Sequence, residues 1–128
     1  MKWFKNIIVV CAVVSLLGLP TKAIAEPLEI KEDIKVYAFK VILEKWGSEQ
    51  WDSFDKLVNK ESRWINTAQN PTTTAYGIGQ FLNSTWKTVG CEKTSNEYEQ
   101  VDCMIDYIEY RYEKPSKALQ FHLKNNYY

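Results

Sequence analysis

Apolar residues recur at helical spacing along much of the 128-residue chain, whereas no stretch carries a strong strand pattern. In residues 97–114 the apolar positions are separated by four, three and four residues, which places them on one face of an α-helix. Residues 33–46 follow a similar spacing, so the pattern predicts an all-α fold. The apolar positions are Val101, Ile105, Ile108 and Tyr112 in the later stretch, and Ile34, Tyr37, Ala38, Val41 and Leu43 in the earlier one.

Glycine, proline and small polar residues indicate where these helices begin and end. Gly47 is suited to the end of the first helix, and Ser48 can cap the second. Pro115 fits the first turn of the last helix. A turn-rich stretch with Asn-Pro and glycines predicts a loop over residues 66–80. The predicted helices are 33–46, 48–63, a short one from Asn83 or Ser84 to Gly90, 97–114 and 116–125.

Residues 1–25 have the pattern of a secretory signal peptide. Lys2 and Lys5 form a basic start, residues 7–19 form an apolar core, and Ala23-Ile24-Ala25 gives a small-x-small cleavage pattern. The alternative is an uncleaved membrane anchor, but the apolar run is shorter than the ~20 residues that a spanning helix needs. The sequence therefore predicts an exported protein, periplasmic or extracellular, with one domain over residues 26–128.

Charge and cysteine content narrow the classes of function. Removal of Lys2, Lys5 and Lys22 with the signal would turn a balance of 16 basic and 16 acidic groups into an excess of three acids. That charge gives no basis for binding nucleic acid. Cys91 and Cys103 would remain as an even pair, and we expect a disulfide between them in an oxidising compartment rather than two free thiols. One histidine and two separated cysteines do not form a zinc pattern, so no metal is expected.

Glu61 is placed unusually, because it falls within the apolar sector of the helix predicted over 48–63. At about 100° per residue it projects between Leu57 and Phe54. Burial beside such side chains raises the pKa of a carboxyl group, and a carboxyl that keeps its proton near neutral pH can act as a general acid. The alternative is a glutamate at a helix end that leans into solvent. The stripe holds Trp51, Phe54, Leu57, Val58 and, if the helix continues, Ile65; Glu49, Asp52 and Asp55 lie outside it.

The loop after Glu61 has the composition of a sugar-binding surface. It offers uncharged hydroxyl and amide groups for hydrogen bonds, glycines that permit close approach, and aromatic rings on which a sugar can stack. The alternative is an ordinary turn-rich connection with core aromatics. The polar residues are Asn70, Thr72, Thr73, Thr74, Tyr76 and Gln80, the glycines are Gly77 and Gly79, and the aromatic residues are Tyr76, Phe81 and Trp86.

Three blocks in order resemble soluble lytic transglycosylases of the lysozyme-like, glycoside hydrolase family 23 type, as a small secreted member. They are Glu61-Ser62, the stretch AYGIGQ over 75–80, and Ser84-Thr85-Trp86. Residues 107–118 also resemble the C-terminal helices of such proteins, so the resemblance covers roughly residues 46–128. It implies a lysozyme-like helical domain that cleaves the β-1,4 bond between N-acetylmuramic acid and N-acetylglucosamine in peptidoglycan.

The resemblance also implies roles for individual residues. Glu61 matches the catalytic acid and base, and Ser62 matches a serine that orients it or touches substrate. Gly77, Ile78 and Gln80 match the substrate-groove motif Gly-Leu-Met-Gln. Gly79 stands where methionine is usual, and we expect this change to loosen one groove wall.

The family's third motif, Ala-Tyr-Asn, would fall near residues 121–123, where its tyrosine is missing. His122 can take that place, or it can be a surface residue. Tyr107, Tyr127 or Tyr128 can supply a hydroxyl instead. The substrate-binding candidates are therefore Ser62, Tyr76, Gly77, Ile78, Gln80, Trp86, Tyr107 and His122.

Most glycosidases pair two carboxylates, yet no acid occurs between Ser62 and Cys91. Asp102, Asp106 and Glu109 fit one outer helix face instead. We therefore expect a one-carboxylate reaction in which Glu61 acts as acid and then base, with no cofactor, and which leaves 1,6-anhydro ends. The protein is expected to act as a monomer on glycan strands, without nucleic acid and without a membrane after signal cleavage.

Three other functions compete with this prediction. The same scaffold could host a muramidase, in which water attacks and gives plain hydrolysis. A non-catalytic module could bind the cell wall and keep the groove. A small structural or inhibitor protein held by a Cys91–Cys103 disulfide would leave the loop chemistry unexplained.

Overall fold

The first helix, α1 (Ile34–Trp46), begins one residue after the predicted start and ends at Gly47, as predicted. The computed structural model describes residues 31–128, and the predicted signal peptide lies outside the described residues. Asp33 caps α1 by accepting a hydrogen bond from the Lys35 backbone N–H at 2.8 Å. Gly47 ends it at a φ of 95°, a conformation that favours glycine.

The second predicted helix starts later and ends earlier than expected. A short 3₁₀ turn, η1 (Ser48–Gln50), comes first and α2 (Trp51–Glu61) follows, so Ser48 does not cap an α-helix. Arg63 and Trp64 adopt positive φ values of 52° and 64°, which turn the chain away from the helix axis. The apolar stripe therefore stops before Ile65, whose side chain is 51% exposed.

The third helix, α3 (Asn83–Thr88), is capped by a residue of the preceding loop and not by its own first residues. Leu82 occupies the capping position without a side-chain hydrogen bond, so the predicted caps at Asn83 and Ser84 are wrong. The Thr74 hydroxyl accepts from the Asn83 backbone N–H instead, at 3.1 Å. Residues 66–80 form the predicted loop, with isolated β-bridges that pair Tyr76 with residues 69 and 81.

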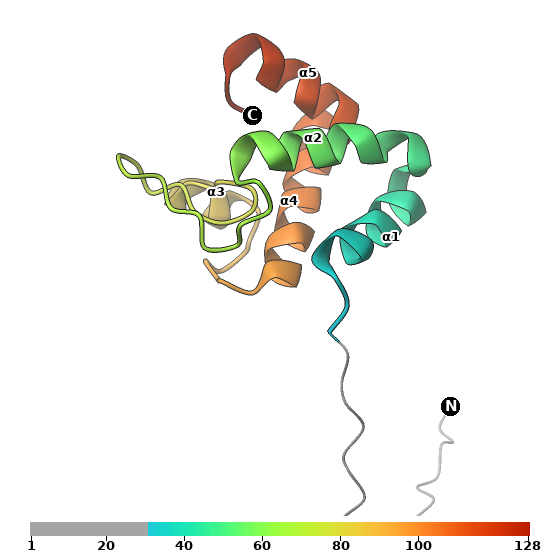
Figure 1. Cartoon of the computed structure of the whole chain (residues 1–128). Helices are drawn as coiled ribbons and strands as arrows, with labels where there is room; N and C mark the ends of the chain where they lie inside the picture. Colours follow the sequence, from blue (N-terminus) through green and yellow to red (C-terminus); the bar gives the residue numbers. More distant parts are fainter. Residues whose placement is uncertain (1–30) are drawn as a thin grey trace, which may run out of the picture. The chain divides into compact units, whose positions relative to one another are not determined.

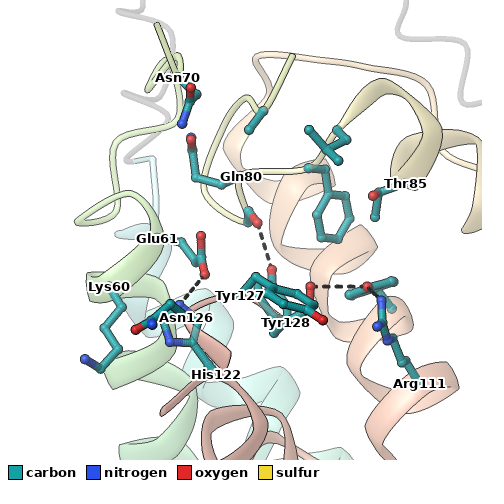
Figure 2. A pocket seen from close by; sticks show the side chains of 15 residues that line it. Lys60, Glu61, Asn70, Gln80, Thr85, Arg111, His122, Asn126, Tyr127 and Tyr128 are labelled. Atoms are coloured by element: carbon teal, nitrogen blue, oxygen red, sulfur yellow. Dashed lines mark hydrogen bonds and ion pairs between the residues drawn. The ribbon is translucent and has the colours of Figure 1, made fainter. Parts of the chain in front are cut away.

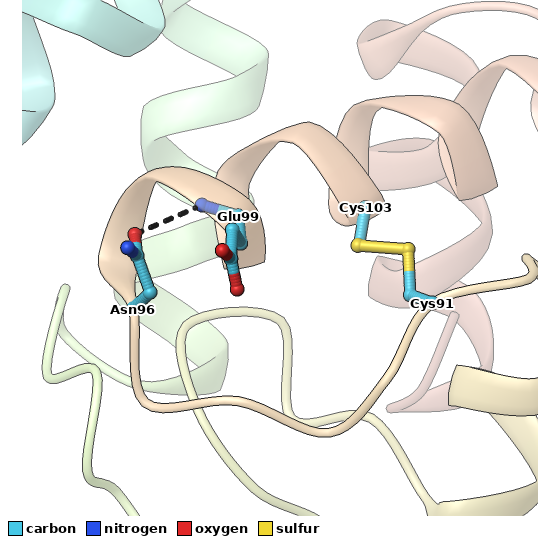
Figure 3. The surroundings of a disulfide bond; sticks show 4 residues. All are labelled: Cys91, Asn96, Glu99 and Cys103. Carbon is cyan, nitrogen blue, oxygen red and sulfur yellow. Dashed lines mark hydrogen bonds between the residues drawn. A yellow bond between two sulfur atoms is a disulfide. The ribbon is translucent and has the colours of Figure 1, made fainter.

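The last two helices, α4 (Glu97–Tyr112) and α5 (Pro115–Asn125), complete an all-α fold, as predicted. The Asn96 side chain caps α4 by accepting from the backbone N–H groups of Tyr98 and Glu99, the second of which Figure 3 shows. Glu113, with a φ of 70°, ends α4 two residues before the predicted end. Pro115 stands in the first turn of α5, as expected.

Helix α4 runs through the middle of the domain, and α1 and α5 pack against it (Figure 1). Its buried side chains belong to the same core as those of α1 and α2, and α5 also packs against α2. The disulfide between Cys91 and Cys103 ties the segment before α4 to that helix, as predicted (Figure 3). Among the helices of residues 31–128, none has the length and hydropathy needed to span a bilayer. The central core residues are Ala38, Ile42, Phe54, Leu57, Val58, Val101, Met104, Ile105 and Ile108.

Candidate active site

Glu61 is the last residue of α2, one turn after the buried residues Leu57 and Val58. Its side chain is only 15% exposed. Because burial disfavours the charged carboxylate, the pKa of Glu61 is raised to about 7. The carboxyl group therefore does not lean freely into solvent, and near neutral pH a large fraction of it is protonated.

The Glu61 carboxyl group opens onto a cavity of about 630 Å³ (Figure 2). Ligand pockets usually span roughly 300–1,000 Å³. Within residues 31–128, Glu61 is the one acidic side chain that lines this cavity. The lining residues come from α2, from the 66–85 segment, from α4, from α5 and from the segment after α5: Lys60, Glu61, Asn70, Ala75, Gly79, Gln80, Phe81, Leu82, Thr85, Tyr107, Arg111, His122, Asn126, Tyr127 and Tyr128.

His122 on α5 meets Glu61 directly. Its Nε2 lies 2.7 Å from Glu61 Oε1, and its side chain is 12% exposed, so His122 is not a free surface residue. Burial lowers the pKa of His122, and the nearby positive charge of Lys60 lowers it further. Two titratable groups from helices far apart in sequence thus share one sheltered contact.

Gln100, a buried residue of α4, holds the loop that forms one side of the cavity. Its Oε1 accepts from the Ile78 N–H at 2.8 Å, and its Nε2 donates to the carbonyl oxygens of Asn66 at 2.8 Å and Thr94 at 2.7 Å. Gly77, at a φ of 82°, lies so close that an added Cβ would sit 2.7 Å from the Gln100 amide. Gly77 and Ile78 therefore shape the loop from behind the cavity.

Gln80 lines the cavity, and its amide nitrogen already has partners. Its Nε2 donates to the carbonyl oxygens of Ala68 and Gly77, both at 2.9 Å. In the view of Figure 2 the Gln80 side chain lies between Asn70 and Glu61. Gln80, a predicted substrate-binding residue, thus lies in the lining of the cavity near Glu61.

The cavity wall at Gly79 is filled by the side chain of Tyr128. The expectation that a glycine at this position loosens the groove wall is therefore wrong. The Tyr128 hydroxyl donates to the Gly79 carbonyl oxygen at 2.9 Å. A Cβ at position 79 would meet that hydroxyl at 2.9 Å, so a larger residue there would displace the Tyr128 hydroxyl. Burial raises the pKa of Tyr128 well above its ordinary value, which keeps the hydroxyl protonated as a donor.

Several predicted substrate-binding residues do not line the cavity. The Ser62 side chain is buried and its hydroxyl donates to the Val58 carbonyl oxygen at 3.4 Å, within α2. The Tyr76 hydroxyl pairs with Ser95 Oγ at 2.6 Å. Trp86 is 3% exposed and packs in the core, so it offers no ring to a sugar. Aromatic side chains next to a glycine-rich loop thus form core here, as the alternative interpretation allowed.

Arg111 also lines the cavity, although it was not predicted from the sequence as a site residue. Its Nη1 donates to the Tyr107 hydroxyl at 2.5 Å, and its guanidinium lies 5.4–5.8 Å from the centroids of three aromatic rings. Residues 107 and 111 are four apart on α4, so helical spacing could have paired them. Tyr107, a predicted candidate, does line the cavity, and its hydroxyl donates to the Tyr128 carbonyl oxygen at 3.3 Å.

The acids of α4 face away from the cavity, as predicted. Asp102 accepts a hydrogen bond from the Tyr37 hydroxyl at 2.8 Å, and Glu109 pairs with Lys45 at 2.6 Å. Asp106 is exposed. Across residues 31–128, no three histidine, cysteine or acidic side chains come together as metal ligands.

Comparison of the chain with protein-family models, with curated proteins and with solved structures found no match.

Proposed function

We propose that the protein is a peptidoglycan lytic transglycosylase, in which Glu61 is the catalytic acid and base. One observation carries the proposal: a sheltered carboxyl group, with a pKa raised to about 7, is the one acid that lines a cavity of ligand size among the described residues. A general acid works best when its pKa lies near the pH at which it operates. The ordered motif blocks around Glu61 and Gln80 give independent support.

The reaction requires a single protein carboxyl group. Protonated Glu61 gives its proton to the glycosidic oxygen, and the C1–O bond breaks. The 2-acetamido oxygen of the N-acetylmuramic acid stabilises the positive charge that develops at C1. The ionised Glu61 then accepts the proton of the C6 hydroxyl, whose oxygen bonds to C1, so that a 1,6-anhydro end forms and no water is consumed.

The remaining lining of the cavity is suited to an N-acetylated sugar. Asn70, Gln80 and Thr85 offer amide and hydroxyl groups for hydrogen bonds to hydroxyl and acetamido groups. Phe81 and Leu82 add apolar area for the C–H faces of the ring. Lys60 and Arg111 add two positive charges to the lining, so one acid, two basic groups, and uncharged polar and apolar groups face the cavity.

Export of the protein belongs to the same proposal. Peptidoglycan lies outside the cytoplasmic membrane, where oxidising conditions let disulfides persist. The Cys91–Cys103 disulfide and the signal-peptide pattern of residues 1–25 both fit that compartment.

Release of soluble fragments from purified cell-wall sacculi tests the proposal. Glu61→Gln keeps the size of the side chain but removes the titrating proton, so we expect turnover to fall by about 10²–10⁴-fold. Asp52→Asn is the matched control, because the same carboxyl-to-amide change is made on α2 at a side chain that is 76% exposed.

The wild-type protein and the Asp52→Asn variant should release fragments at similar rates. The Glu61→Gln variant should be folded but nearly inactive. Equal activity of the wild-type protein and Glu61→Gln would reject Glu61 as the acid. Binding of sacculi without release by the wild-type protein would favour a non-catalytic wall-binding module.

A further inference from the structure

The two oxygens of the Glu61 carboxyl group have different surroundings. Oε1 lies 2.7 Å from His122 Nε2. The other oxygen points away from His122, toward the side on which Gln80 lies (Figure 2). His122 therefore fixes one oxygen and leaves the second free to meet a ligand in the cavity.

Other polar groups beside this contact have partners of their own. The Tyr128 hydroxyl is committed to the Gly79 carbonyl oxygen, and the Gln80 amide nitrogen is committed to the carbonyl oxygens of residues 68 and 77. Lys60, the neighbouring residue on α2, is exposed. The charged and titratable groups that face the pair are thus Lys60 from α2 and Tyr128 from the segment after α5.

A nitrogen and an oxygen 2.7 Å apart are at hydrogen-bond distance, and one proton between them would relieve the repulsion of their lone pairs. If Nε2 carries that proton, it donates to Oε1, and the acidic proton of Glu61 resides on the oxygen that faces the cavity. If Nε2 is unprotonated, the Glu61 proton resides on Oε1 and points toward His122, away from a substrate in the cavity. The tautomer of His122 therefore decides whether Glu61 can act on a glycan.

We propose that His122 positions the Glu61 carboxyl group by donating its Nε2–H to Oε1, so that the catalytic proton is held on the oxygen at the cavity. His122 acts through Glu61 and binds no substrate itself, which revises its predicted role as a substrate-binding residue. Its effect on catalysis rests on the proposed function, whereas the position of the proton can be tested without any substrate.

Nitrogen-15 NMR of the purified protein tests the proton position directly, since the chain contains one histidine. At neutral pH we expect Nε2 to carry the proton, Nδ1 to be bare, and the Nε2–H signal to be protected from exchange with water. In Glu61→Ala that protected signal should disappear, because the acceptor is gone. A proton on Nδ1, or an Nε2–H signal that persists unchanged in Glu61→Ala, would overturn the proposal.

Two variants of His122 then test the consequence for catalysis. Gln can place an amide N–H near the position of Nε2, whereas Phe keeps the ring but has no donor. We expect His122→Phe to lower kcat by up to about 100-fold with little change in KM, the cost of misplacing a catalytic group. His122→Gln should recover most of that loss.

The pH profile separates positioning from a merely structural role. Loss of the donor disfavours the carboxylate form, so the pKa of Glu61 should rise in His122→Phe and activity should persist to higher pH. His122→Gln should keep the wild-type profile. Equal losses in both variants with unshifted profiles would overturn the proposal. An inactive wild-type protein with the expected NMR result would reject the proposed function alone.

Discussion

At the scale of single residues, the protonation of Glu61 links folding to chemistry. The folded-state pKa of about 7 exceeds the ordinary value of 4.5, so the folded protein binds this proton more tightly than the unfolded chain does. The resulting stabilisation is complete below about pH 4.5 and is lost as the pH rises through 7. A site that holds its acid protonated thus loses stability toward alkaline pH.

Glu61→Gln should remove that pH dependence, because an amide does not titrate. We expect the free energy of unfolding of Glu61→Gln, relative to the wild-type protein, to increase by up to about 3 kcal/mol between pH 4 and pH 8. Urea unfolding of both proteins across this range measures the difference, and groups common to both cancel. A difference that stays constant with pH would mean that Glu61 is not sheltered.

Glu61 could be found from the sequence because helical projection depends only on local spacing. A role for His122 could be suggested only because it stands near a missing motif residue. Its contact with Glu61 joins two residues that are 61 positions apart in the sequence, which local spacing cannot reveal. Trp86 was predicted wrongly as a sugar platform because composition cannot tell a buried ring from an exposed one. Tyr128 was considered only for its hydroxyl, and its place against Gly79 required tertiary structure.

At the scale of elements, the 66–80 loop depends on one buried amide. Gln100 binds three backbone groups of the surrounding segments, and Gly77 approaches it closely enough to exclude any side chain. A buried polar group left without its partners costs roughly 1–3 kcal/mol. The cavity wall therefore keeps its shape only while this arrangement is intact.

Two glycines provide a matched test of that crowding. Gly77 and Gly90 both have positive φ values, 82° and 70°, but an added Cβ meets the Gln100 amide at the first and nothing within 4 Å at the second. Gly90→Ala should cost about 1–2 kcal/mol, the strain of a left-handed alanine. Gly77→Ala should cost at least about 1 kcal/mol more. Chemical denaturation measures both, and equal losses would contradict the role of Gln100.

The helices themselves were largely predictable, whereas their ends were not. Apolar spacing identified the regions of α1, α2 and α4 because each buries one face, and Pro115 indicated where α5 begins. The start of α3 depends on a hydrogen bond from the Asn83 backbone N–H to Thr74, nine residues earlier in the chain. Helix α4 ends at Glu113, which has a positive φ although no glycine stands there. Such ends are set by tertiary contacts that local propensity does not contain.

At the scale of the whole molecule, the Cys91–Cys103 disulfide supports the small domain. It closes a loop that contains Asn96, the cap of α4 (Figure 3), and the same loop includes the buried Gln100. A loop of this size contributes about 3 kcal/mol in the loop-entropy account. The cysteine count was enough to predict the pair, but not that the loop includes the residue that holds the cavity wall.

Replacement of both cysteines by serine should therefore lower the free energy of unfolding by about 3 kcal/mol. The same loss should appear when the wild-type protein is reduced, and the double variant should be insensitive to reductant. Denaturant titrations with and without reductant measure these differences. An unchanged midpoint in the double variant would show that the cross-link adds nothing to the folded domain.

The arrangement that makes the candidate site arises only when the domain is assembled. Helix α5 packs on α2 and brings His122 to Glu61, while the segment after α5 brings Tyr128 to Gly79. The resulting cavity, with Arg111 in its lining, could not be derived from one sequence.

The masses of the products released from sacculi test the central claim most directly. If the single carboxyl group of Glu61 acts as acid and then base, the fragments carry 1,6-anhydro ends and are lighter by one water than fragments with reducing ends. We predict anhydro fragments with the wild-type protein and none with Glu61→Gln. Reducing ends alone would contradict the one-carboxylate transglycosylase reaction and favour a hydrolase.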